Sequence, residues 1–182
     1  MTHRIATTGC PVPGAASGPV LFADVGMSFM GGVDPRSGEV IDTHHPLRGR
    51  SVAGTILAMP SGRGSCAGSL GIFELLLNGH APRALVFSRN DTILTLGVVI
   101  AHEVFGCGIP ILWVGDEDFA TLANAGYALI DGAELTVADE PLAEIGPRAA
   151  LAPLDLDGFT LTPRDRLMLA GGFGAAAAMA LR

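Results

Sequence analysis

Three short apolar runs in the middle of the chain constrain its fold more than any other feature. They are Ser51–Met59, Ala84–Phe87 and Pro110–Val114. Each is short, apolar and bordered by turn-forming residues, which favours buried strands. Segments with helical periodicity separate the runs and follow the third one. Strands that alternate with helices are typical of an α/β domain, so we expect a mixed α/β architecture.

Three helices are expected between and after these strands. The first follows Gly68 and stops at Asn78-Gly79, because glycine accepts the left-handed conformation that ends a helix. Asp91 or Thr92 would cap the second, which runs through Val104. Asp116 would cap the third, with Gly126 as its end. The apolar face expected for the first helix comprises Leu70, Phe73, Leu76 and Leu77.

The chain on either side of this α/β region is organised differently. Residues 1–58 are rich in glycine, proline and β-branched residues, which predicts short strands packed as a sandwich or partial barrel with flanking helices. Residues 133–160 lose periodicity and are interpreted as a strand remnant and a linker. We therefore place one small domain at 1–150 and a linker with the beginning of a further domain at 151–182.

Composition and charge exclude several classes of function. A net charge of −7 without any cluster of Lys or Arg argues against nucleic acid as a partner. No apolar run reaches the roughly 18 residues of a membrane span, and the chain start lacks an apolar signal core, so we expect a cytoplasmic protein. Cys10, Cys66 and Cys107 show no CxxC spacing, which indicates reduced thiols and no self-contained metal site. Hydrophobic residues make up 49% of the chain, which fits either a partner-covered surface or a well-buried core.

The loop Ser61-Gly62-Arg63-Gly64-Ser65 carries the strongest indication of chemistry. Its glycines let the backbone approach a ligand, and the following helix directs its positive N-terminal end toward the loop. Arg63 has a planar fork that suits a carboxylate or phosphate, and Ser65 could become an alkoxide in such positive surroundings. The alternative is that Ser61 and Ser65 cap the helix while Arg63 points into solvent. The residues alone leave both interpretations open.

A dinucleotide site is a rival interpretation of the same loop. Gly62-x-Gly64-x-x-Ala67 after a strand meets the loose fingerprint, and Ser88-Arg89 resembles a phosphate-recognising strand end. That fingerprint belongs after the first strand of a doubly wound sheet, however, and here a long β-rich segment precedes it. A nucleotide P-loop is excluded because the loop has no Gly-Lys-Ser/Thr ending.

Several motifs resemble those of the aconitase X family, in order along residues 15–130. The resemblance rests on Ser28–Pro35, Ile41–Pro46, Pro60–Ser69, Glu74–Gly79 and Ala81-Pro82. Met30 departs from the family, which usually has an aromatic residue there. Leu161–Gly171 resembles the opening of the family's large domain, so we expect a fused enzyme that is truncated here. A free-standing small subunit with a longer tail is the alternative.

The resemblance implies a swivelling β/β/α domain, as in the aconitase superfamily, that closes over a large domain carrying iron or an iron–sulfur cluster. It also implies a hydro-lyase acting on a small anionic hydroxy acid or imino acid. We favour cis-3-hydroxy-L-proline over phosphomevalonate, because fusion and an Ala-rich composition suggest the bacterial branch. A non-catalytic binding or assembly module and an NADP-binding domain remain alternatives of other classes.

The family pattern also assigns roles to individual residues. Ser65 would be the proton-abstracting base. A second group would hold the anionic part of the substrate, and it comprises Ser61, Gly62, Arg63 and Gly64. Asp34 and His45 are candidate cleft residues, and no residue of this chain is expected to bind metal.

Overall fold

The computed structural model describes residues 2–142. This part of the chain forms eight strands, three α-helices and one short 3-10 helix. The strands are β1 (Thr2–Ile5), β2 (Thr7–Val12), β3 (Ala15–Phe22), β4 (Ile56–Met59), β5 (Ala84–Phe87), β6 (Ile111–Val114), β7 (Tyr127–Asp131) and β8 (Glu134–Ala138). The helices are α1 (Gly68–Leu77), α2 (Thr92–Phe105) and α3 (Asp116–Thr121), with the 3-10 turn at Leu122–Asn124.

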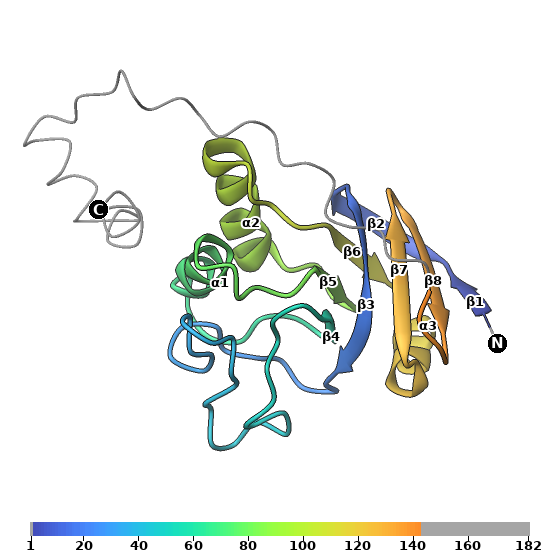
Figure 1. The fold of residues 1–182 in the computed structure, drawn as a ribbon, viewed down its shortest axis with the longest axis horizontal. Helices are drawn as coiled ribbons and strands as arrows, with labels where there is room; N and C mark the ends of the chain where they lie inside the picture. Colours follow the sequence, from blue (N-terminus) through green and yellow to red (C-terminus); the bar gives the residue numbers. More distant parts are fainter. Residues whose placement is uncertain (1, 143–182) are drawn as a thin grey trace, which may run out of the picture.

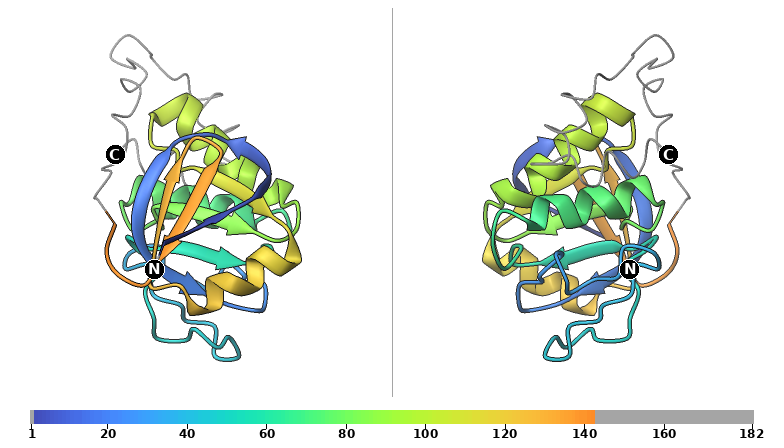
Figure 2. Two further views of the ribbon diagram at one scale, coloured as in Figure 1. Left: turned by 90° about the vertical axis from the view of Figure 1, so that its right-hand side faces the viewer. Right: turned by 90° about the vertical axis from the view of Figure 1, so that its left-hand side faces the viewer.

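The strands form one sheet in the order β1-β8-β7-β3-β4-β5-β6-β2. Strands β3, β4, β5 and β6 are parallel, whereas every other pairing is antiparallel. The two edge strands, β1 and β2, are separated in the chain only by Ala6. One curved N-terminal segment therefore joins both edges of the sheet (Figure 2). This arrangement is a partial barrel, one of the two expected forms, but it is built from all eight strands, and residues 23–55 contribute no named strand to it.

The three central strands are buried on both faces, and their side chains alternate between two cores. The even positions Ile56, Ala58, Ala84, Val86, Leu112 and Val114 face the interior of the curved sheet. The odd positions Leu57, Met59, Leu85, Phe87 and Ile111 pack with the helices. Figure 1 shows α1 and α2 on one side of β4, β5 and β6, with β7 and β8 on the other. Such two-sided burial explains why these strands are continuous apolar runs without polar alternation.

Helices α1 and α2 pack closely because a glycine lies at their contact. A Cβ atom added to Gly97 of α2 would lie 2.3 Å from the carbonyl oxygen of Ser69 in α1. Gly71 of α1 is also crowded, since an added Cβ would lie 2.7 Å from the backbone of Phe29. Helix α1 is therefore enclosed by α2 and by the chain around Phe29, and this enclosure fixes where the loop before it lies.

Some expected boundaries are wrong, and local contacts explain them. Only Ile56–Met59 of the run Ser51–Met59 is a strand, because Gly54 has a positive φ of 73° within a preceding turn. The third helix ends at Thr121, and its N-cap is Gly115 rather than Asp116. Gly126 permits close backbone approach: an added Cβ would lie 2.5 Å from the carbonyl oxygen of Asp139.

Two further expectations also differ from the structure. Residues 134–138, where a strand remnant was expected at the start of a linker, form a regular strand paired with β7 across a turn in which Gly132 has φ of 61°. In α1, Leu70 and Leu77 are only partly buried, whereas Ile72 and Leu75 are fully buried. The buried arc of this helix is wide because it is covered from two directions. The proposed boundary at residue 150 and the Leu161–Gly171 motif lie outside the described residues.

Within residues 2–142 the structure contains no helix that is long and apolar enough to cross a membrane.

His45 is the buried histidine of the loop that joins β3 to β4. Its side chain is 4% exposed, and its Nδ1 atom accepts a hydrogen bond from the backbone N–H of Leu47 at 3.2 Å. Its Nε2 atom is buried without a hydrogen bond of good geometry. Burial lowers the pKa of this imidazole below its ordinary value of 6.5. Interaction with the Val25 backbone and the negative charge of Asp42 raise the pKa, but by less.

The glycine at the α1–α2 contact yields a test of packing. Gly97→Ala should destabilise the fold by about 1–3 kcal/mol, because the new methyl group has no space. Helix propensity alone predicts the opposite sign, a gain of about 1 kcal/mol. Gly68→Ala is the matched control, since its Cβ would make ordinary 3.6 Å contacts with Ile93 and Leu94. Urea unfolding measures both variants, and stabilisation by Gly97→Ala would contradict the packing argument.

His45 predicts a dependence of stability on pH. Because its pKa is lowered in the folded protein, the unfolded chain takes up a proton first as the pH falls below 6.5. The free energy of unfolding should therefore fall between pH 7.5 and pH 5.5, and this decline should be smaller in His45→Asn. The Asn Oδ1 atom can still accept the Leu47 N–H. His44→Asn is the control at a 90% exposed side chain. An unchanged slope in His45→Asn would contradict the assignment.

Candidate functional site

The loop of residues 60–67, here called the serine loop, follows β4 and leads into α1. Because β4 and β5 are parallel, the segments that leave them emerge at the same edge of the sheet. The segment after β5 therefore lies beside the serine loop, and the backbone N–H of Arg89 donates to the carbonyl of Pro60 at 3.0 Å. In open α/β sheets this edge is the usual place for ligand sites.

Ser65 lies at the beginning of α1 with its side chain exposed. Its Oγ atom accepts a hydrogen bond from the backbone N–H of Ala67 at 3.3 Å, and its carbonyl accepts one from Gly68 at 3.0 Å. The N-cap of α1 is Ala67, which makes no side-chain capping bond. The positive end of the helix thus favours negative charge at the Ser65 oxygen. Ser61 does not cap the helix, because its hydroxyl donates to the carbonyl of Gly62 at 3.1 Å.

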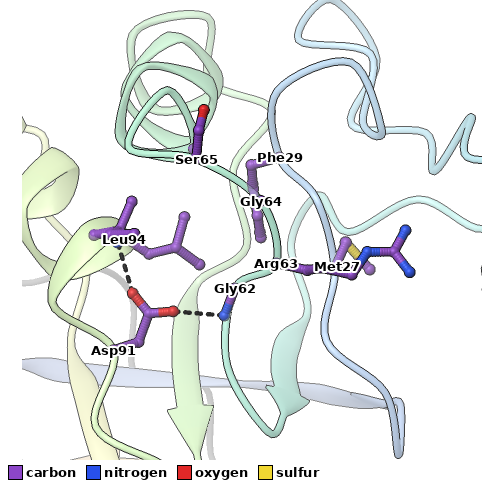
Figure 3. A pocket seen from close by; sticks show the side chains of 10 residues that line it. Met27, Phe29, Gly62, Arg63, Gly64, Ser65, Asp91 and Leu94 are labelled. Carbon is purple, nitrogen blue, oxygen red and sulfur yellow. Dashed lines mark hydrogen bonds between the residues drawn. The ribbon is translucent and has the colours of Figure 1, made fainter.

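The Arg63 side chain is directed away from Ser65 (Figure 3). Its backbone N–H donates to the carbonyl of Met27 at 2.9 Å, and its Nη2 atom lies 2.5 Å from the Oδ2 atom of Asp42. The Arg63 side chain is half exposed, at 56%. Arg63 therefore neither converges with Ser65 nor points freely into solvent. It forms an ion pair that joins the serine loop to the segment around Asp42.

Asp42 is a residue of this site that the sequence reasoning missed. Its Oδ1 atom accepts the backbone N–H of His44 at 2.9 Å, and its side chain is only 14% exposed. That hydrogen bond, together with the positive charge of Arg63, holds the pKa of the carboxyl below its ordinary value of 3.8 despite the opposing effect of desolvation. Asp42 lies in the Ile41–Pro46 motif, but no sequence pattern identifies Arg63 as its partner.

A second missed feature is the double role of Asp91. The sequence indicated it only as a possible cap of α2, and it does accept the backbone N–H of Leu94 at 2.7 Å. Its other oxygen, Oδ2, accepts the backbone N–H of Gly62 at 2.5 Å (Figure 3). The glycines of the loop fit this arrangement. Gly64 has a positive φ of 113°, and a Cβ on Gly62 would lie 2.9 Å from Asp91 Oδ2.

The structure places the two candidate cleft residues away from the serine loop's lining. Asp34 forms a turn, in which its Oδ1 atom accepts the backbone N–H of Arg36 at 3.0 Å. This hydrogen bond is the main reason why the pKa of the Asp34 carboxyl is lowered. His45 is buried in its own loop. That these residues line a cleft stays a prediction.

No metal centre is visible among residues 2–142, because no three side chains of His, Cys, Asp or Glu come together there. The three cysteines are free thiols. Burial raises the pKa of the Cys10 and Cys107 thiols, which keeps them protonated and makes them poor ligands. Cys66 is exposed beside Ser65. These residues do not fit an iron or iron–sulfur group, and we derive no step through a metal from them.

The surface hollow at the serine loop is too small to enclose a substrate. Its volume of about 10 Å³ is roughly that of one water molecule, whereas sites for small molecules usually measure at least about 300 Å³. The hollow is lined by Met27, Phe29, Gly62, Arg63, Gly64, Ser65, Gly68, Asp91, Ile93 and Leu94. The described residues therefore do not enclose a substrate site by themselves. The Asp91 carboxylate on Gly62 also disfavours a dinucleotide, whose pyrophosphate would meet a negative charge there.

Comparison with known proteins places these features in a family. The family model described as the aconitase X swivel domain matches residues 6–138. The chain is 48% identical to a cis-3-hydroxy-L-proline dehydratase of Pseudomonas aeruginosa and 44% identical to one of Hypocrea jecorina. Each comparison covers 94% of this chain but only 29% of the relative. The chain thus spans less than a third of the length of these curated relatives.

More distant matches have the length of a separate subunit. The phosphomevalonate dehydratase small subunit of Methanothermobacter thermautotrophicus is 41% identical over 60% of this chain and 79% of its own length. The crystal structure of Thermococcus kodakaraensis aconitase X in its holo-form aligns with a TM-score of 0.65 and 32% identity, covering 75% of this chain and 98% of that one. A UPF0107 protein solved by NMR aligns with a TM-score of 0.61 and 31% identity, covering 78% and 99%. These structures confirm the swivel-domain fold, and the chain belongs to the aconitase X swivel-domain family.

Proposed function

We propose that this chain is the swivel-domain part of a hydro-lyase that dehydrates cis-3-hydroxy-L-proline to Δ1-pyrroline-2-carboxylate. The observation that carries the chemistry is the exposed Ser65 hydroxyl, held by the Ala67 N–H at the positive end of α1. The substrate is supported by the two dehydratases, which match 94% of the chain at 44% and 48% identity.

In this reaction Ser65 removes the proton from the carbon that bears the substrate's carboxylate. Hydroxide leaves the neighbouring carbon, and the resulting enamine rearranges to the cyclic imine. A serine hydroxyl is a weak base in water, so it needs neighbouring positive charge. The Ala67 N–H and the dipole of α1 supply part of it, since both favour the alkoxide form.

In this proposal Arg63, whose side chain points away from Ser65 in the structure, turns from Asp42 to hold the substrate's carboxylate. Arg63 pairs with Asp42 in the structure, but its side chain is 56% exposed. Because the Arg63 end of this ion pair is open to solvent, a substrate carboxylate can reach the guanidinium and replace Asp42 as its partner. Ser61, Gly62 and Gly64 shape the backbone that surrounds the anion.

The remaining parts of the active site lie, in this proposal, in a large aconitase X domain. The small hollow at the serine loop supports this, because it is too small to enclose a substrate. The iron or iron–sulfur group that assists departure of hydroxide would be held by that domain, given the lack of a ligand cluster among residues 2–142.

The second candidate is phosphomevalonate dehydration, with this chain as a small subunit. It is favoured by the 41% identity to the Methanothermobacter subunit, which covers 79% of that protein. The chemistry at Ser65 would be the same. We favour the imino acid because the hydroxyproline dehydratases match more of this chain at higher identity.

The role of Ser65 is tested in the intact, anaerobically purified enzyme that contains both domains. Ser65→Ala should lower the rate of cis-3-hydroxy-L-proline dehydration by at least about 10²-fold, because the hydroxyl that accepts the proton is lost. Cys66→Ala, at the next exposed residue, should retain activity. Loss of turnover with substrate binding intact separates catalysis from a non-catalytic assembly role. Full activity in Ser65→Ala would contradict the proposal, and turnover of phosphomevalonate alone would favour the second candidate.

The role of Arg63 is tested by measuring the KM of the intact enzyme for its substrate. Arg63→Lys should raise KM by roughly tenfold, because an ammonium group cannot hold a carboxylate through two parallel hydrogen bonds. The control is Arg50→Lys, at an exposed arginine of the loop that joins β3 to β4. Steady-state kinetics on the intact enzyme provide the measurement. An unchanged KM in Arg63→Lys would show that this side chain remains with Asp42 during catalysis.

A further inference from the structure

We infer that Asp91 is the positioning residue of the serine loop: its single carboxylate ties that loop to the start of α2 and so sets the place of Ser65. The inference rests on the proposed function, because it concerns the residue that is proposed as the base. Asp91 lies in the segment after β5, outside every motif on which the family resemblance rests. Its side chain is buried, at 6% exposed.

The carboxylate makes two hydrogen bonds to backbone groups that are distant in sequence. Oδ1 accepts the N–H of Leu94 at 2.7 Å, which caps α2. Oδ2 accepts the N–H of Gly62 at 2.5 Å, three residues before Ser65. Figure 3 shows the Asp91 side chain between these two partners, with Ser65 further along the same loop.

Only a carboxylate fits this arrangement well. Both of its oxygens are acceptors, whereas an amide has one oxygen and an NH₂ group that would face a second donor. A serine could still cap α2, but its one hydroxyl is too short to bridge to Gly62 as well. Capping alone therefore does not require aspartate at position 91, and the bond to Gly62 is what distinguishes it.

The loop is built to receive this carboxylate. A Cβ on Gly62 would lie 2.9 Å from Asp91 Oδ2 and 3.0 Å from Leu94 Cδ1, so glycine lets the two segments approach. The serine loop is held on its other side by the Arg63 N–H on Met27 and by the Arg63–Asp42 pair. Among the side chains that hold the loop, Asp91 is buried, whereas the Arg63 side chain is 56% exposed. Charged hydrogen bonds in buried surroundings are the stronger kind, so Asp91 determines the loop position most firmly.

Two variants of the intact enzyme separate positioning from capping. Asp91→Ser keeps the cap and removes the bond to Gly62, and Asp91→Asn keeps the shape but only one acceptor. Each should lower kcat/KM by at least about tenfold at a temperature where it is fully folded, because displacement of a catalytic group by about 1 Å can cost 10²-fold. Hydrogen–deuterium exchange should become faster in the peptide containing Gly62, while the start of α2 stays protected in Asp91→Ser.

Either of two results would overturn the inference: parental kcat/KM in Asp91→Ser, or lost activity with unchanged exchange at Gly62. Asp91→Ala, which loses both bonds, serves only to show the effect of removing the cap. The exchange measurement does not depend on the reaction. If the parent enzyme turned over neither substrate, the proposed function would fail, and the exchange at Gly62 would still support or overturn the tie between Asp91 and the serine loop.

Discussion

The burial of β4, β5 and β6 on both faces is the constraint on which the rest of the structure depends. Alternate side chains of these strands must fill two different cores, one inside the curved sheet and one beneath α1 and α2. Strands buried in this way are parallel and are joined by helical crossovers. Parallel direction in turn brings the segments after β4 and β5 to one edge. The contact between Asp91 and Gly62 is therefore a consequence of topology as much as of local sequence.

The segment between β3 and β4 also contacts the serine loop. Met27 and Asp42 of this segment both bind Arg63, one through the backbone and one through the side chain. Two motifs of the family resemblance, Ser28–Pro35 and Ile41–Pro46, flank or contain these contact residues. They have no helical or strand periodicity because their residues form turns, such as those that Asp34 and Asp42 close with backbone N–H groups. This explains why the motifs are recognisable as a set but uninformative about secondary structure.

The sequence predicts the α/β architecture, the partial barrel and the serine loop, because two-sided burial and glycine spacing are local patterns. The β7–β8 hairpin was not predicted, although its sequence has ordinary hairpin signals. These are the Asp131-Gly132 turn and the alternating apolar residues Ala128 and Ile130. The Arg63–Asp42 and Asp91–Gly62 contacts could not be predicted in this way. They join residues 21 and 29 positions apart, and many acidic residues of the chain are equivalent by local pattern.

A serine that is exposed to water is a poor proton-abstracting base unless its surroundings change during the reaction. Water screens the helix dipole at an exposed site, so the Ala67 N–H and the end of α1 favour the Ser65 alkoxide only weakly there. A second domain that covers the serine loop would expel this water and strengthen every remaining electrostatic interaction. In the proposed enzyme, closure of the swivel domain therefore both completes the substrate site and activates its base. A loop that must enter such a closed site needs a fixed shape beforehand, and the buried carboxylate of Asp91 provides it.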